Sequence, residues 1–179
     1  MTAEQLITYA KAEGFENVAV VDTKDIPFEP DFRKYCVENL CGQYGVNYAC
    51  PPDCGTTDEM EAKILKHSHA LLVQYICDLP DPTDKAAVKA FKGTVNKGVM
   101  NLKTKLRAAG CDGFAIGAGG CSLCTPCARA ENLPCKLPNM QYSCMSAYCI
   151  NVQKLADSVG MTYFCDSGKA AFFGMYVCD

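Results

Sequence analysis

The chain has 179 residues, of which 14 are Cys and none is Trp, and its formal net charge is −3. A chain of this length buries enough surface to fold without disulfide bonds, which excludes a small secreted disulfide scaffold. The mild acidity argues against a general nucleic-acid binder, and no run of about 18 apolar residues predicts a membrane helix. The first residues lack the basic and apolar segments of a secretory signal, so we expect a cytoplasmic protein with reduced thiols.

Helix and strand signals alternate along the chain. Helices are expected where apolar residues recur every three or four positions before a glycine, and strands where β-branched residues form short runs. The expected helices are residues 2–13, 56–66, 83–109 and 145–159, and the expected strands are residues 17–22, 70–76, 113–118, 161–165 and 171–177. The last two strands flank residues 166–169 and so predict a closing β-hairpin.

Capping residues support three of these helices. Thr2 with Gln5 and Thr56 with Glu59 have the spacing of capping boxes, and Thr83 is the expected N-cap of the third helix. The alternation predicts one α/β domain over residues 1–179, with a mostly parallel or mixed sheet of about five strands flanked by helices. Two Cys-rich metal-binding loops are expected at one end of this sheet, where the carboxyl ends of strands form a crevice.

The second Cys-rich loop, residues 119–142, carries the strongest signal for a metal site. Cys121, Cys124 and Cys127 are separated by two residues each, and Cys135 follows after a longer interval. Three thiolates at this spacing with a remote fourth are typical of the loops that bind a [4Fe-4S] cluster. A zinc site is the alternative, although zinc more often takes two well-separated Cys pairs.

The first Cys-rich loop, residues 36–55, holds four more candidate ligands. Cys36, Cys41, Cys50 and Cys54 have a less diagnostic spacing, and the adjacent glycines and prolines predict an irregular backbone. We expect a second iron–sulfur cluster here. A zinc site, or one or two Cys that only fill space in the core, are the alternatives.

Two segments of the chain resemble a known family. They are Cys41-Gly42-Gln43-Tyr44-Gly45 with Cys50-Pro51-Pro52, and Gly119-Gly120-Cys121-Ser122-Leu123-Cys124 with Cys127, Pro134-Cys135 and Pro138. Together they are similar to an uncharacterised prokaryotic family whose members are labelled predicted metal-binding proteins of unknown function. The resemblance covers about residues 15–177 and implies a cysteine-ligated metal or iron–sulfur site. The ligands that it supports are Cys36, Cys41, Cys50, Cys121, Cys124, Cys127 and Cys135.

The other six Cys are expected to have different roles. Cys144 and Cys149 begin the fourth expected helix, where similar sequences carry other residues, and we do not predict them as ligands. A helix N-terminus would lower the pKa of Cys144, which makes it the first candidate for a reactive thiol, but a packing role or an accidental position is the favoured interpretation of both thiols. The remaining four are expected to pack as small apolar side chains: Cys77, Cys111, Cys165 and Cys178. The two histidines, His67 and His69, are expected to stabilise a helix end.

The predicted function is that of an iron–sulfur protein with one or two [4Fe-4S] clusters, from an organism with anaerobic chemistry. The expected role is electron transfer to a redox partner protein, with no nucleic acid or membrane involved and no catalytic residues predicted. Helix 83–109 carries seven basic residues against Asp84 alone, a charge that suits an acidic partner or simply a solvated face. The alternatives are a zinc-binding structural or interaction module, and an enzyme whose cluster has an open iron site.

Overall fold

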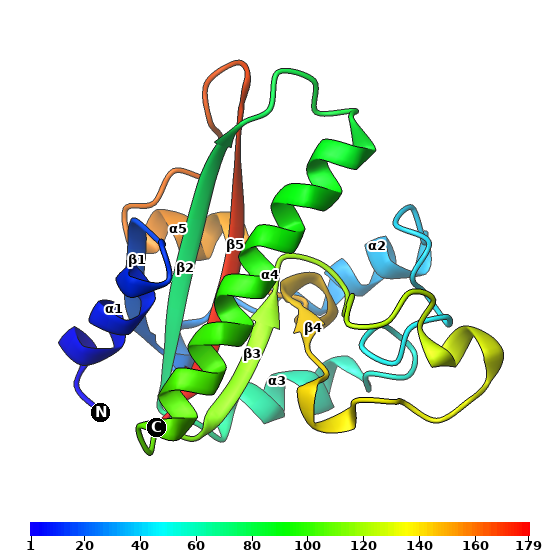
Figure 1. Ribbon diagram of the computed structural model, residues 1–179, viewed down its shortest axis with the longest axis horizontal. Helices are drawn as coiled ribbons and strands as arrows, with labels where there is room; N and C mark the ends of the chain where they lie inside the picture. The colour runs from blue at the N-terminus through cyan, green and yellow to red at the C-terminus, as the bar shows by residue number, and fades with distance from the viewer.

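The computed structural model describes residues 1–179 and contains one five-stranded sheet in the order β1-β2-β5-β3-β4 (Figure 1). The strands are β1 (Asn17–Asp22), β2 (His69–Asp78), β3 (Gly113–Gly117), β4 (Ser143–Cys144) and β5 (Lys169–Cys178). Strands β3 and β4 are parallel, and the other three neighbouring pairs are antiparallel. The predicted α/β class with a mixed sheet of five strands is confirmed.

Helices cover both faces of the sheet. They are α1 (Ala3–Ala12), α2 (Arg33–Val37), α3 (Thr57–Leu65), α4 (Lys85–Ala108) and α5 (Val152–Ser158), with short 3₁₀ turns between them, among them η5 (Met145–Tyr148). Buried side chains of α1 and α4 form a core on one face, and those of α3, η5 and α5 form a second core on the other. None of these helices combines the length and the apolar character that crossing a bilayer requires.

The alternative of a mostly parallel sheet is wrong, and the position of β5 is the reason. Strands β2 and β3, which α4 connects, do run parallel to each other, as the alternation of helix and strand predicts. They are not neighbours, because β5 inserts between them and pairs antiparallel with both. The apolar residues of β5 are accordingly buried, including Met175, Tyr176 and Val177.

The prediction of a closing hairpin is also wrong, because residues 161–165 do not form a strand. Strand β5 pairs with β2 along its whole length, so that side of β5 has no free edge for a hairpin partner. The side chain of Gln74, which is buried, donates a hydrogen bond to the carbonyl of Thr162 at 2.6 Å. The segment is therefore held as an irregular loop over the sheet.

The fourth predicted helix is interrupted at Cys149. Residues 145–148 form η5, Cys149 adopts a left-handed backbone with φ of 54°, and α5 begins only after the N-cap Asn151. The cause is an extended segment that pairs with this stretch. Glu29 donates its backbone N–H to Cys149 at 2.8 Å, and Asn151 donates to Pro27 at 2.8 Å. Cys144 consequently lies in β4 and precedes only the single 3₁₀ turn η5, not the start of a continuous helix.

The capping patterns are confirmed at two helices and corrected at a third. Thr2 with Gln5 and Thr56 with Glu59 form complete capping boxes. Helix α4 is capped by Asp84 rather than by Thr83, since the Asp84 carboxylate accepts the first free N–H groups of that helix.

Candidate metal centre

Both Cys-rich loops lie beyond β4, at the edge of the sheet (Figure 1). The second loop leaves the carboxyl end of β3, whereas the first follows α2, which packs against η5. The predicted position at one end of the sheet is therefore wrong. Strands β1 and β3 run in opposite directions, so their carboxyl ends lie at opposite ends of the sheet. The loops meet beside the short strand β4 instead.

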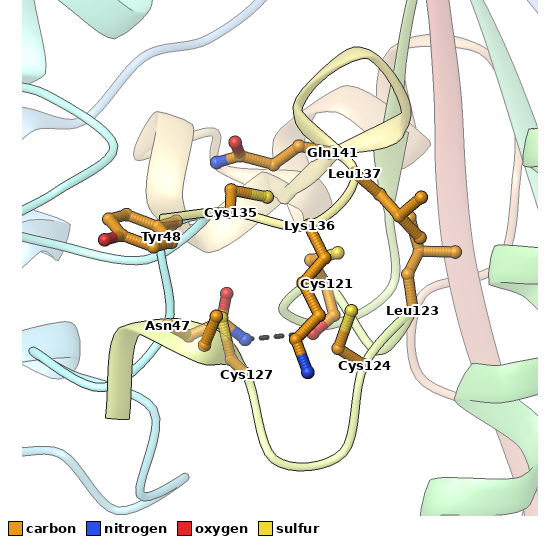
Figure 2. A pocket seen from close by; sticks show the side chains of 11 residues that line it. Asn47, Tyr48, Cys121, Leu123, Cys124, Cys127, Cys135, Lys136, Leu137 and Gln141 are labelled. Atoms are coloured by element: carbon orange, nitrogen blue, oxygen red, sulfur yellow. Dashed lines mark hydrogen bonds between the residues drawn. The ribbon is translucent and has the colours of Figure 1, made fainter. Parts of the chain in front are cut away.

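Four thiols of the second loop line one cavity (Figure 2). They are the four predicted ligands: Cys121, Cys124, Cys127 and Cys135. The first loop closes the cavity with Asn47 and Tyr48, and the Tyr48 hydroxyl donates a hydrogen bond to the carbonyl of Leu133 at 2.9 Å. The donor set is thus rich in sulfur, and it is built by both loops. No three His, Cys, Asp or Glu side chains of the protein lie close enough to enclose a single metal ion.

Backbone N–H groups point at one of these sulfurs. Burial raises the pKa of Cys121, while hydrogen bonds from the N–H groups of Leu123 and Tyr142 act in the opposite direction. Repulsion from the Cys127 and Cys135 thiolates raises it further. Cys121 is partly buried, accepts N–H hydrogen bonds and lies among other thiols, and metal-bound thiolates commonly have these partners.

Asn47 joins the two loops. Its side chain is only 1% exposed, and its amide donates hydrogen bonds to the carbonyl of Cys121 at 2.9 Å and to the side chain of Gln43 at 3.0 Å. Its oxygen accepts the N–H of Ala49 at 3.0 Å. A second link at the rim joins Arg129 to Asp53 at 2.8 Å. The position of Cys121 therefore depends on the first loop.

Replacing Asn47 is expected to weaken this junction. Asn47→Ala leaves the carbonyl of Cys121 without its side-chain partner, which should cost about 1–3 kcal/mol of stability and reduce metal retention at the second loop. Gln43→Ala is the matched control, because it removes one bond of Asn47 and keeps the two that reach Cys121 and Ala49. Thermal unfolding and metal content check both variants. Equal effects of the two changes would contradict the assigned role of Asn47.

The two loops touch where Gly120 meets Cys50. A Cβ atom added at Gly120 would lie 2.9 Å from the Cys50 sulfur and 3.5 Å from the Asn47 amide nitrogen. Real side-chain atoms do not approach that closely, so glycine is required here for steric reasons. Cys50, a candidate ligand of the first loop, is therefore packed directly against the residue that precedes Cys121.

The candidate thiols of the first loop gather near η5, and two further thiols lie with them. Burial raises the pKa of Cys36 to about 11, and repulsion from the Cys144, Cys149 and Cys41 thiolates contributes. Burial likewise raises the pKa of Cys50, with repulsion from Cys144, Cys41, Cys54 and Cys36. All four predicted ligands of this loop thus lie near one another, but the structure adds Cys144 and Cys149 to the group.

Arg33, on α2, is the cation of this thiol group. Its guanidinium lies 3.7 Å from the Cys54 sulfur and donates a hydrogen bond to the carbonyl of Ala147 at 3.0 Å. Burial alone would lower the pKa of Arg33, but the Cys54 hydrogen bond and the Cys149, Cys54 and Cys36 thiolates raise it. Arg33 is therefore charged and stabilises negative charge on the surrounding sulfurs.

Sequence reasoning missed Cys144, Cys149, Arg33 and Asn47. One signal was available, because Cys144 and Cys149 have the same spacing as Cys36 and Cys41, with four residues between. The lowered pKa predicted for Cys144 is not found, because burial raises it more than the N–H groups at the start of η5 lower it.

The remaining predicted residues have structural surroundings. Cys77, Cys111 and Cys178 are buried, as packing roles require, and Cys178 lies beside Cys111, whereas Cys165 is only partly buried. His67 bonds to the Asp179 carboxylate at 3.0 Å, and His69 lies 3.3 Å from that of Asp22. Neither histidine lines the cavity of the second loop.

Comparison with known proteins gives one finding. A family model described as a predicted metal-binding protein matches residues 19–177, which include both Cys-rich loops. No curated protein and no solved structure matches the chain.

Proposed function

This chain belongs to the DUF2284 family of predicted metal-binding proteins, and from that premise we propose that its metal is iron, held as two [4Fe-4S] clusters that transfer electrons. The observation that carries the proposal is the cavity of the second loop, which four thiols line. Three closely spaced sulfur donors and a fourth, more distant one suit a cluster, and soft thiolates favour iron–sulfur or zinc over hard cations.

In the second loop, Cys121, Cys124, Cys127 and Cys135 would hold the first of these clusters. The N–H groups of Leu123 and Tyr142 would then donate to a ligand sulfur, and such hydrogen bonds are one means by which a protein sets the reduction potential. The burial of Cys121 limits solvent access on one side of the site.

In the first loop, Cys36, Cys41 and Cys50 would hold a second cluster, with Cys54 as the predicted fourth ligand. The charged Arg33 guanidinium beside this group favours the state with more negative charge, so it would raise the reduction potential of this site. The contact between Gly120 and Cys50 supports electron exchange between the two sites.

The proposed role is to accept one electron from a reduced donor protein and to pass it to an acceptor protein. Several lysines of α4 are exposed, including Lys85, Lys89 and Lys97, and Lys92 lies beside Gly119 at the start of the second loop. This basic surface suits an acidic partner. Free thiolate ligands also require a reducing compartment, for which we propose the cytoplasm.

Metal analysis of anaerobically purified protein tests the proposal. Iron and acid-labile sulfide in equal amounts, a brown colour and a paramagnetic-resonance signal after reduction are the expected results. Zinc without labile sulfide would overturn the iron–sulfur assignment. Cys127→Ser should remove the cluster of the second loop, whereas the control Cys165→Ser, outside both loops, should keep the full iron content.

A further inference from the structure

We propose that Cys144 completes the metal site of the first loop together with Cys36, Cys41 and Cys50, in the place that the sequence assigns to Cys54. This inference rests on the proposed function, because it names the ligands of one of its two sites. It adds a ligand from a distant part of the chain, which neither the Cys spacing of the loop nor the family resemblance predicts.

The backbone places Cys144 beside the first loop. Strand β4 pairs with β3, with Cys144 opposite Gly117, and this pairing fixes the start of η5 at the edge of the sheet. Helix α2 packs on that turn, since the Cys36 thiol lies 3.8 Å from the carbonyl of Ser146 and Arg33 bonds to that of Ala147. The segment that carries Cys144 thus packs against the beginning of the first loop.

The four thiols are mutual electrostatic neighbours. After burial, repulsion from Cys144 is the largest cause that raises the pKa of Cys36 and of Cys50. Cys41 repels Cys36, Cys50 and Cys144, and Cys36 repels Cys50. Since this repulsion weakens with distance, all six pairs among the four thiols are close. These thiols do not enclose a single metal ion, but a [4Fe-4S] cluster is larger, and its iron atoms would offset the repulsion in every pair.

The surroundings of Cys144 are those of a ligand sulfur. The backbone N–H groups of Ser146 and Ala147 donate hydrogen bonds to it and oppose the rise in its pKa that burial causes. This repeats the arrangement at Cys121, where N–H groups of Leu123 and Tyr142 point at the sulfur. Cys121 and Cys144 thus each accept backbone N–H hydrogen bonds, an arrangement that suits metal-bound thiolates.

Cys54 has a different partner. Its sulfur lies 3.7 Å from the Arg33 guanidinium, and Arg33 also bonds to Cys149. Of Cys36, Cys50 and Cys144, only Cys50 has Cys54 among the main causes of its shifted pKa. Cys54 and Cys149 thus both contact Arg33 and lie beside the four proposed ligands.

Metal content of two matched variants tests the assignment. Wild-type protein, Cys144→Ser and Cys54→Ser are purified anaerobically, and iron, zinc and sulfide are measured per chain. We expect Cys144→Ser to lose about half of its metal and Cys54→Ser to keep all of it, because a cluster that lacks one of its Cys ligands is released. The half that Cys144→Ser retains at the second loop shows that this variant is folded. Loss in Cys54→Ser together with full retention in Cys144→Ser would overturn the inference.

A second measurement does not depend on a folded variant. Wild-type protein is alkylated before and after metal removal, and each Cys is identified by mass spectrometry. Cys144 should become reactive together with Cys36, Cys41 and Cys50, while the reactivity of Cys54 stays unchanged. The reverse pattern would contradict the assignment. If wild-type protein holds zinc instead of iron, the proposed function fails, but both tests still identify the ligands.

Discussion

Removal of the metal is expected to release both Cys-rich loops while the sheet remains folded. The amides of residues 36–55 and 119–142 should exchange with solvent roughly 100-fold faster or more, because metal–thiolate bonds supply folding energy that these segments lack without metal. Residues 38–56 contain no helix or strand, and the second loop contains only short 3₁₀ turns. Strands β2 and β5 pair along ten residues and pack between two cores, so their protection should not change.

Hydrogen exchange followed by mass spectrometry checks this prediction, before and after treatment with an iron chelator under oxidising conditions and reduction of the freed thiols. Cys127→Ser is the control, since its second loop should exchange rapidly even before chelation. Loops that are protected equally with and without metal would show that they are structural segments independent of a bound metal.

A single methyl group at Gly120 is expected to remove the metal of the first loop. In Gly120→Ala the new Cβ would overlap the Cys50 sulfur, which must move away from its place among the other thiols. We expect the loss of about half of the metal per chain, since a cluster depends on each of its Cys ligands. Asn47 lies 3.5 Å from the same position, which is an ordinary contact distance, so the second loop should keep its metal.

The adjacent glycine provides a matched control. A Cβ at Gly119 would meet only the flexible side chain of Lys92, at the ordinary distance of 3.5 Å. Neither glycine adopts a left-handed backbone, so the two alanine variants differ only in what the added methyl group contacts. Gly119→Ala should therefore keep its metal. If both variants lose metal equally, or neither does, the contact between the loops does not position Cys50.

Elements that depend on nearby residues could be predicted from the sequence. The capping box of Thr56 and Glu59 and the strand at residues 17–22 were both found, because their signals lie within the element itself. The edge position of β1 was not found, and the strand is half-buried rather than buried. An edge and a central strand differ in their neighbours, which a local pattern does not contain.

Contacts between distant segments explain the larger errors. The insertion of β5 between β2 and β3 depends on pairing that no segment specifies alone. The break at Cys149 likewise depends on residues 27–29, which bond to residues 149 and 151. Without that partner, the apolar spacing from Met145 to Val159 is that of one continuous helix.

The same distinction applies to the candidate site. The candidate ligands of the second loop lie within one short segment, and the spacing of Cys121, Cys124 and Cys127 was enough to group them. At the first loop, the role proposed for Cys144 depends on the pairing of β4 with β3 and on the packing of α2 against η5. Neither contact can be predicted from the spacing of Cys36, Cys41 and Cys50.

The central place of β5 in the sheet has a consequence for biosynthesis. Both Cys-rich loops precede β5 in the chain, so their thiols leave the ribosome before the strand that joins β2 to β3. Until β5 pairs with β2 and β3, the core under α4 is incomplete and β3 with its neighbour β4 is not joined to the rest of the sheet. The two loops are then not held in the positions that bring them into contact. We therefore expect the metal to bind only after translation, when the completed sheet holds the thiols of both loops near one another.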